Sequence, residues 1–444
     1  MTHSNRISPL FTDLYELTMA ASYFEHGIFD PAVFSTFIRA SHDGSRRNYY
    51  VAAGLEGVLD ALENLHFDSE EIAYLKSTGL FSETFLDYLK RFRFTGSVAA
   101  MPEGAIFFHD EPVLEVTAPM PEAQLPATFI LNVLGFQTLI ATKAARCMHA
   151  AQGRSLIDFS LRRTQGWDAG NLVARCTRIA GFAATSNVYA AMRYGIPPSG
   201  TMAHSYIEAF ESEQAAFSAY AKTFPHQSVF LIDTYDTLEG ARNAAAVARS
   251  MKRKGNHLIG VRLDSGDMAA LSKEVRKILD QEGLHDVKIV ASSGFDEFKI
   301  ARVLKEGARI DSFGVGTKMG VSADAPYLDI VYKIVRFADR DVRKLSPGKI
   351  TLAGKKQVFR QSAGNGHYLE DIIGAREESI EGAETLLETV MEGGKILRPH
   401  PELSDIQRHF ARNFRRLDDA YKSLDKEVRF PVGISARLKA LQGN

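Results

Sequence analysis

The 444-residue sequence has little cysteine and no excess of charge of either sign. Its two cysteines, Cys147 and Cys176, form neither a disulfide framework nor a paired metal motif, and such low cysteine use favours a reducing compartment. The 53 lysines and arginines nearly balance the 54 aspartates and glutamates, so no overall field attracts nucleic acid or an anionic membrane. Recognition of a charged partner must therefore come from a local site, as suits a small charged substrate.

Long apolar runs and several familiar motifs are also missing. No stretch reaches the roughly 18 apolar residues of a membrane span, and the N-terminus has no charged flank before an apolar run. There is no P-loop, no H-E-x-x-H and no C-x-x-C, which leaves Walker-type phosphate binding and the familiar zinc sites unsupported. We expect a cytoplasmic protein that is neither exported nor embedded, and the sequence assigns no metal ligand.

The length suggests two or three domains unless one of them is a large α/β barrel. Residues 1–120 mix strand-like runs with a helical stretch near residues 54–90, which is typical of an α+β domain with a largely antiparallel sheet. In residues 121–340 short apolar strands alternate with helices, the rhythm of βαβ units. Residues 341–444 return to strand patterns, end in a charged helix, and are predicted to pack back on the first domain.

The chain is predicted to open with a helix over residues 12–27. Thr12 or Asp13 would be its N-cap, Glu16 stands in the capping-box position, and Gly27 would end it.

The second region carries polar residues where its predicted strands end. The near-regular spacing of roughly 20 to 30 residues per unit favours a barrel-like arrangement, although a doubly wound sheet remains possible. In both folds the carboxyl ends of the strands form the active face. The seven predicted strand ends lie within residues 155–163, 183–187, 200–205, 229–237, 258–267, 287–297 and 310–318.

Arginines, aspartates, one histidine and a glycine turn are thus expected to lie together at the carboxyl-terminal end of the predicted barrel. Arginines hold oxyanions in forks, and aspartates hold a metal or its waters, so the set suits a phosphorylated substrate that carries magnesium. The polar and glycine residues at these ends are Asp158, Arg162, Arg163, Thr201, His204, Asp233, Asp236, Arg262, Asp264, Asp267, Ser292, Ser293, Gly314, Gly316 and Thr317.

Three features of this set have a structural as well as a functional interpretation. A lone histidine is usually structural, but His204 follows an apolar strand pattern, and a histidine in such a place suits proton transfer or phosphorylation. Arg262 and Asp264 are two apart on one strand and can reach one ligand, or they can form an ion pair at the rim. The turn from Gly314 to Thr317 can bind a phosphate with its backbone N–H groups, or simply be a tight βα turn.

Taken together, nine blocks of the sequence resemble the nicotinate phosphoribosyltransferase family, in order from residue 12 to about residue 360. Two departures concern loop shape: Ser160 stands where many relatives have glycine, and Ala183 and Ala184 stand where an Asp-Gly pair is frequent. The blocks are TDLYELTMA (12–20), FRFTGSVAAMPEG (92–104), FQTLIATKAAR (136–146), DFSLRRTQG (158–166), SGTMAHS (199–205), DTYDT (233–237), VRLDSGD (261–267), FGVGT (313–317) and DAPYLDIVYKIV (324–335).

The resemblance implies a fold and a set of roles. The fold is an irregular α/β barrel of the type II phosphoribosyltransferase kind, beside an N-terminal α+β domain completed by the C-terminal segment. It also implies a homodimer in which the N-terminal part of one subunit completes the other's site. Phosphorylation by ATP is implied for His204, and Asp264 is the second candidate catalytic residue. Substrate contacts are implied for Tyr15, Phe159, Arg162, Thr201, Arg262, Gly314, Gly316 and Thr317.

The implied reaction joins nicotinate to 5-phosphoribosyl-1-diphosphate with Mg²⁺ and ATP, giving nicotinate mononucleotide, diphosphate, ADP and phosphate. The sibling activity on nicotinamide uses an aspartate to select the amide, and the corresponding place here is Ser186, which favours the acid. Quinolinate would need a more basic pocket and belongs to shorter enzymes. A catalytically silent paralogue is the alternative from another class, against which the intact His204 and Arg262 argue.

Overall fold

The computed structural model describes residues 7–40, 47–344 and 351–443. The chain divides into two compact units, of which the first combines Met1–Leu139 with Tyr327–Asn444 and the second is Ile140–Pro326. The first unit is therefore discontinuous in sequence. The C-terminal segment joins the N-terminal one in a single unit, which confirms the predicted completion of the N-terminal domain.

The first unit is built on an antiparallel sheet in which β1 (Pro31–Ile38) is an interior strand. β1 pairs with β5 (Leu114–Pro119) on one side and with β12 (Ile330–Phe337) on the other, and all but its first residue are buried. The sheet order is β13-β12-β1-β5-β3-β17-β18, as the antiparallel prediction required. Its other strands are β3 (Ser97–Ala100), β13 (Arg340–Asp341), β17 (Glu388–Glu392) and β18 (Lys395–Ile396).

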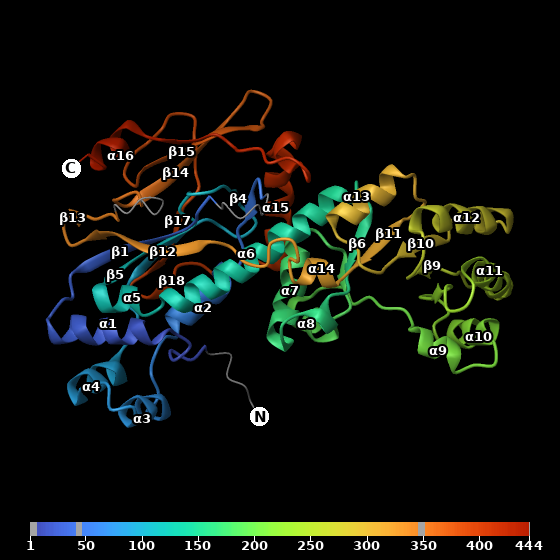
Figure 1. Cartoon of the computed structure of the whole chain (residues 1–444), viewed down its shortest axis with the longest axis horizontal. Coiled ribbons are helices and arrows are strands. Elements are labelled where there is room, and N and C mark those ends of the chain that lie inside the picture. Colours follow the sequence, from blue (N-terminus) through green and yellow to red (C-terminus); the bar gives the residue numbers. More distant parts are fainter. Residues whose placement is uncertain (1–6, 41–46, 345–350, 444) are drawn as a thin grey trace. The chain divides into compact units, whose positions relative to one another are not determined.

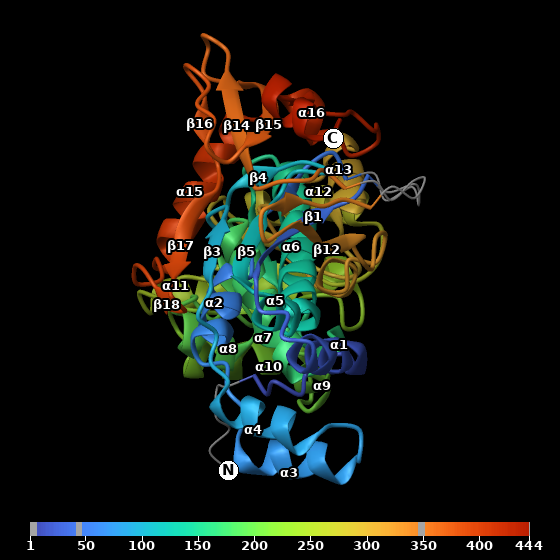
Figure 2. The ribbon, with the colours of Figure 1, turned by 90° about the vertical axis from the view of Figure 1, so that its left-hand side faces the viewer.

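Two smaller sheets and several helices complete this unit. In Figure 2, β14 and β15 form a hairpin with α16 packed beside β15. The smaller sheets contain β2 (Tyr50–Val51) and β4 (Ile106–Phe107) in one, and β14 (Lys356–Ser362), β15 (Tyr368–Ala375), β16 (Glu384–Thr385) and β19 (Val432–Ile434) in the other. The helices are α1 (Leu14–Glu25), α2 (Leu55–Glu63), α3 (Ser69–Ser77), α4 (Glu83–Arg91), α5 (Met120–Gln124), α15 (Leu403–Arg416), η2 (Asp419–Lys422) and α16 (Ala436–Leu441).

Helix α1 is the predicted opening helix, but its capping differs from the prediction. Asp13 is the N-cap residue and makes no side-chain cap; its carboxylate instead accepts a hydrogen bond from the Thr128 hydroxyl at 2.9 Å. Glu16 is buried and accepts a hydrogen bond from the Gln124 amide. The capping box was therefore a wrong prediction, because both acidic side chains bind partners outside the helix.

The second unit contains six parallel strands in the order β7-β6-β11-β10-β9-β8, with helices between them, which confirms the predicted irregular α/β barrel. In Figure 1 helices α11, α12 and α13 follow one another along the strands β9 to β11. The strands are β6 (Ser155–Asp158), β7 (Ala184–Thr185), β8 (Val229–Leu231), β9 (Gly260–Leu263), β10 (Lys288–Ala291) and β11 (Ser312–Val315). The helices are η1 (Leu161–Arg163), α7 (Trp167–Ile179), α8 (Val188–Tyr194), α9 (His204–Glu208), α10 (Glu213–Thr223), α11 (Thr237–Arg253), α12 (Met268–Gln281), α13 (Glu297–Lys305) and α14 (Thr317–Gly320).

One of the seven predicted strand ends is wrong. Residues 200–203 have no regular structure and His204 begins helix α9, while only a single bridge joins Pro198 to Thr185. The proline pair at 197–198 and the glycine at 200 explain this, because proline cannot donate to a ladder and glycine weakens a strand interior.

Helix α6 (Ala127–Ala150) crosses the boundary between the two units in sequence. With α5 it forms the stretch Met120–Ala150, which is long and apolar enough to cross a membrane by length and composition, contrary to the expectation that no such stretch exists. However, 72% of its most apolar window is buried inside the protein. That burial is what a core helix shows, since a lipid-facing helix leaves its apolar surface uncovered.

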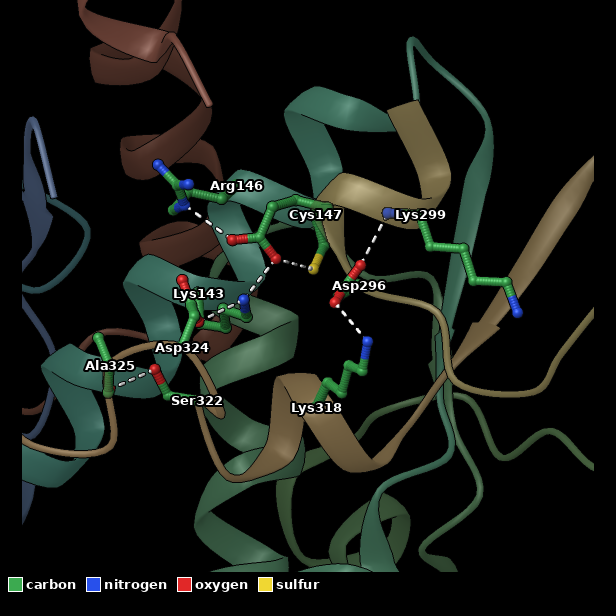
Figure 3. Close-up of polar contacts among 10 residues, drawn as sticks. Lys143, Arg146, Cys147, Asp296, Lys299, Lys318, Ser322, Asp324 and Ala325 are labelled. Carbon is green, nitrogen blue, oxygen red and sulfur yellow. Dashed lines mark hydrogen bonds and ion pairs between the residues drawn. The ribbon is translucent and has the colours of Figure 1, made fainter. Parts of the chain in front are cut away.

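A buried ion network lies in the second unit, between α6 and the first turn of α13 (Figure 3). Glu297 is fully buried; its Oε2 lies 2.5 Å from Lys143 Nζ and its Oε1 lies 2.9 Å from Arg146 Nε. Lys143 also contacts Asp324 at 2.6 Å. The charges are thus paired and hydrogen-bonded, the condition under which they can stay out of water.

Replacing Glu297 by alanine should lower the free energy of unfolding by about 3–5 kcal/mol, because Lys143 and Arg146 would each lose a buried counter-charge. Urea unfolding of the purified chain measures this. Glu274→Ala is the control, since its pair with Lys277 is exposed and 3.8 Å long, and exposed pairs contribute roughly 0–1 kcal/mol. Equal effects of the two substitutions would contradict the prediction.

Candidate active site

Hydrogen bonds join the carboxyl ends of three neighbouring strands, β8, β9 and β10. Just after β8, Asp233 Oδ2 accepts from the backbone N–H of Asp264 at 2.8 Å and from the Ser265 hydroxyl at 2.6 Å. Just after β10, the Ser292 hydroxyl donates to Asp264 Oδ1. Asp233 Oδ1 is buried and has no hydrogen-bond partner among the residues that the structure describes, so an acceptor oxygen is left over at this edge of the sheet.

His204 and Asp264, the two candidate catalytic residues, face each other at this edge. His204 Nε2 lies 3.9 Å from Asp264 Oδ2, and both side chains remain partly exposed. On the other side of the ring, His204 Nδ1 lies 3.1 Å from the Thr234 hydroxyl. The imidazole is therefore held through one nitrogen, while the other nitrogen points towards a carboxylate.

Arg262 and Thr201 come together although they are far apart in sequence. One terminal nitrogen of Arg262 donates to the Thr201 hydroxyl at 2.7 Å and the other donates to the Met202 carbonyl at 3.1 Å. Burial lowers the pKa of the Arg262 guanidinium, opposed by the negative charges of Asp264 and Asp233. Its Nε is buried and has no hydrogen-bond partner in the described part of the chain, so one donor of this cation is unused there.

The glycines of the predicted phosphate turn pack against Phe159, which follows strand β6. A Cβ at Gly314 would lie 2.5 Å from the Phe159 ring, and a Cβ at Gly316 would lie 2.8 Å from the Phe159 carbonyl oxygen. Gly316 is the N-cap residue of α14, and the side chain of Thr317 is exposed at its first position. The glycines thus have a packing function that the sequence did not indicate, and Thr317 is left at the surface of the turn.

Gly314→Ala should displace the Phe159 ring, because a Cβ 2.5 Å from ring carbons requires movement. We expect a loss of about 1–3 kcal/mol in the free energy of unfolding, the usual cost of overpacking. If Phe159 contacts the substrate ring, the KM for nicotinate should rise as well. Gly364→Ala is the control, since nothing lies within 4 Å of its Cβ. Unfolding and kinetics indistinguishable from those of this control would contradict the prediction.

Asp158, at the end of β6, has a structural role. Its two oxygens accept hydrogen bonds from the hydroxyls of Ser160 at 2.6 Å and Thr185 at 2.8 Å, which fix the turns after β6 and β7. Burial raises the pKa of the Asp158 carboxyl, opposed by these hydrogen bonds. Ser160, which departs from the glycine expected by resemblance, fits because Gly320 faces it: a Cβ at Gly320 would lie 2.5 Å from that of Ser160.

Two further candidates are exposed. Arg162 lies in η1, and its positive charge contributes to lowering the pKa of Arg262. Tyr15 lies on α1 in the first unit and is 55% exposed, and partial burial together with a hydrogen bond to Glu16 raises its pKa to about 12. Tyr15 therefore stays a neutral phenol with an open aromatic ring.

The described part of the chain contains no group of three histidine, cysteine, aspartate or glutamate side chains that could hold a metal ion by itself. Sequence reasoning missed Thr234 as the partner of His204. It also left Asp233 and Ser292 as two of many strand-end polar residues. Their position directly after neighbouring strands was the available signal, but which side chains pair depends on the sheet order.

A curled parallel sheet whose strand ends gather an arginine with an unused donor, an aspartate pair and a histidine defines a small-molecule enzyme for anionic substrates. Three family profiles agree on which one: the N-terminal domain of nicotinate phosphoribosyltransferase matches residues 10–135, the nicotinate phosphoribosyltransferase family 154–347, and its C-terminal domain 381–442. The chain belongs to the nicotinate phosphoribosyltransferase family.

Curated relatives and solved structures are similar over nearly the whole chain. A nicotinate phosphoribosyltransferase of Mycobacterium tuberculosis is 44% identical over 99% of this chain and 94% of its own length. That of Bacillus subtilis is 40% identical over 96% and 92%. The crystal structure of human nicotinic acid phosphoribosyltransferase superposes with a TM-score of 0.86 at 28% identity, covering 97% of this chain and 99% of that one. A nicotinate-nucleotide pyrophosphorylase from Pyrococcus furiosus gives a TM-score of 0.75 at 25% identity, covering 92% and 95%.

Proposed function

We propose that this chain transfers the phosphoribosyl group of 5-phosphoribosyl-1-diphosphate to nicotinate, making nicotinate mononucleotide for NAD synthesis, with ATP consumed through a phosphorylated His204. The observation that carries the choice of substrate is the unused, buried Nε donor of Arg262 beside Thr201. A carboxylate is the acceptor that a buried guanidinium binds best, through charge-assisted hydrogen bonds. The names of the relatives support the same substrate.

Nicotinate would be held by its carboxylate and its ring. Arg262 pairs with the carboxylate, with Thr201 fixing the guanidinium, while Phe159 packs against the flat pyridine ring. Arg162 adds positive charge near the same place. The ring nitrogen is then the nucleophile: it forms the bond to the anomeric carbon as the bond from that carbon to the diphosphate oxygen breaks. The protein mainly positions the two reactants, which is where most of the rate gain of such a transfer arises.

The phosphoribosyl diphosphate would lie at the ends of β9 to β11. The Thr317 hydroxyl and the backbone N–H groups that follow Gly316 offer donors for its phosphate oxygens. Mg²⁺ carried by the diphosphate needs only one or two protein carboxylates, so the absence of a three-ligand cluster among the described residues is compatible with it. Asp264 and Asp233, with its unpartnered Oδ1, are the candidate ligands. The ion would neutralise the charge of the leaving diphosphate.

His204 would accept the γ-phosphoryl group of ATP on a ring nitrogen as the bond to the β-phosphate oxygen breaks and ADP leaves, and would later lose it to water as inorganic phosphate. Because Thr234 and Asp264 stand on either side of the ring, its orientation is set before ATP binds. A phosphorylated His204 adds negative charge and acceptor oxygens beside the substrate phosphates and the metal. ATP hydrolysis could then favour product formation through tighter or more productive binding.

A homodimer in the cytoplasm completes the proposal. Tyr15 presents an exposed aromatic ring on α1, and in a dimer it would cover the nicotinate ring bound to the partner subunit. Leu14 at the start of α1 is 55% exposed and Phe11, three residues before the helix, is 48% exposed, which supports a contact surface at this end of the helix.

The test offers nicotinate or nicotinamide with phosphoribosyl diphosphate and Mg²⁺, with and without ATP, and resolves the mononucleotides by chromatography. We expect product from nicotinate. Product from nicotinamide alone would reverse the substrate assignment, which Ser186 opposes because it supplies no carboxylate to select an amide. No product from either base would favour a silent paralogue.

A further inference from the structure

The side chain of Asp296 joins two neighbouring parts of the second unit. Its Oδ1 accepts a hydrogen bond from the backbone N–H of Lys299 at 2.7 Å and so caps helix α13. Its Oδ2 lies 3.1 Å from Nζ of Lys318, the residue directly after Thr317 (Figure 3). Asp296 is buried, while Lys318 is about half exposed. One carboxylate thus links the N-terminus of α13 to the turn that carries Thr317.

Asp296 is held in place by its neighbour in sequence. Glu297 is fully buried between Lys143 and Arg146 of α6, with contacts of 2.5 and 2.9 Å. The first turn of α13 is therefore fixed to α6 by paired charges that are costly to separate. The Asp296 carboxylate on this turn is already fixed in place. It therefore loses little conformational entropy when it pairs with a lysine.

The same network also holds the chain beyond α14. Lys143 contacts Asp324 at 2.6 Å, and the Ser322 hydroxyl donates to the Ala325 carbonyl at 2.7 Å, closing the turn that follows the helix (Figure 3). Helix α14 has only four residues, Thr317–Gly320, too few to be rigid by its own hydrogen bonds. The contacts of Lys318 and Asp324 therefore add polar supports to the packing of Gly316 on Phe159 and of Gly320 on Ser160.

We propose that Asp296 is a positioning residue for phosphoribosyl diphosphate: through its ion pair with Lys318 it fixes the Thr317 turn in the conformation that binds the substrate phosphate. The inference rests on the proposed function and assigns neither Asp296 nor Lys318 a contact with substrate. Without the pair, the turn samples other conformations, and substrate binding must first order it. The apparent affinity equals the intrinsic affinity multiplied by the fraction of molecules whose turn is in the binding conformation, so it falls as that fraction falls.

Asp296→Asn and Lys318→Met separate this role from helix capping. Asparagine caps as well as aspartate does, so Asp296→Asn keeps the cap of α13 and removes the charge. We expect each substitution to raise the KM for phosphoribosyl diphosphate about tenfold, with kcat and the KM for nicotinate little changed. The double variant should be no worse than either single one, because both remove the same interaction. Lys288→Met is the matched control, since its 3.7 Å pair with Asp311 is exposed and lies at the start of β10.

Hydrogen exchange of residues 314–323 in the substrate-free protein supplies a readout that does not depend on activity. Faster exchange in both variants, but not in Lys288→Met, supports the proposal. A raised KM in Lys318→Met alone would overturn it, because Lys318 would then contact the phosphate directly. Unchanged exchange and KM in both variants would also overturn it. If the wild-type protein binds no phosphoribosyl diphosphate, the proposed function fails, and the role of Asp296 in substrate binding fails with it. Hydrogen exchange would then still show whether the ion pair of Asp296 with Lys318 orders the Thr317 turn.

Discussion

Replacing Arg262 by methionine should raise the KM for nicotinate by about 100-fold or more, with the protein still folded. Methionine keeps much of the side-chain volume and removes every donor, so the substrate carboxylate would lose its cation in a partly buried place. The Thr201 hydroxyl and the Met202 carbonyl, which Arg262 now binds, would lose their partner as well. Steady-state kinetics with nicotinate varied at saturating phosphoribosyl diphosphate measure the effect.

Two further variants sharpen this experiment. Arg262→Lys should recover only part of the affinity, since lysine keeps the charge but not the planar fork that binds Thr201, Met202 and a carboxylate together. Arg242→Met is the control: it removes an exposed arginine of the same unit, whose 2.9 Å partner Glu239 is one helical turn away. An unchanged KM for nicotinate in Arg262→Met would move the carboxylate site elsewhere.

In His204→Ala the ratio of the rates with and without ATP should fall to about one. The reason is that His204 is the histidine that faces Asp264 in the described part of the site, so the variant lacks the group that accepts the phosphoryl group. Incubation with ATP labelled at its γ-phosphate should transfer label to the wild-type protein and not to this variant. Acid-labile, base-stable label is the property of a phosphohistidine. Thr234→Val should reduce the labelling rate without abolishing it, since Thr234 orients the ring and does not accept the phosphoryl group.

His285→Ala controls for non-specific labelling, because His285 is an exposed histidine of the same unit that lies 3.1 Å from Asp280. Label retained in His204→Ala would place the phosphoryl group on another residue. Loss of label with ATP stimulation preserved would separate ATP use from the histidine.

Much of the fold could be predicted from the sequence because local patterns determine it. Alternating apolar strands and amphipathic helices gave six of the seven expected strand ends, and aspartates before helices α11 and α13 act as caps. The failed strand at residues 200–205 has an apolar pattern that the preceding Pro197 and Pro198, together with Gly200, override. The expectation of no membrane span rested on the lack of an uninterrupted apolar run, and polar residues interrupt the stretch of α5 and α6. Its mean hydropathy is nevertheless high enough for a membrane span.

The sequence predicted which residues belong to the site, but not which of their side chains contact one another. Residue types at strand ends indicated Arg262, Asp264 and His204, and the structure brings His204 to Asp264 and Thr201 to Arg262. Which side chains pair depends on the order of the strands, which no local pattern contains. The packing of Phe159 on Gly314 is likewise a contact between β6 and β11, distant in sequence. All the roles assigned by resemblance, those of His204 and Arg262 as well as those of Tyr15, Arg162 and Thr317, stay predictions.

The interior position of β1 in its sheet has a consequence for synthesis on the ribosome. One of its two neighbours, β5, follows soon after it, but the other, β12, emerges only after the whole second unit has been made. Until β12 is made, one edge of β1 has no strand to pair with. Unpaired strand edges of this kind promote aggregation with other chains. Rapid completion of the inserted unit, or a chaperone that covers this edge, would therefore raise the yield of native protein.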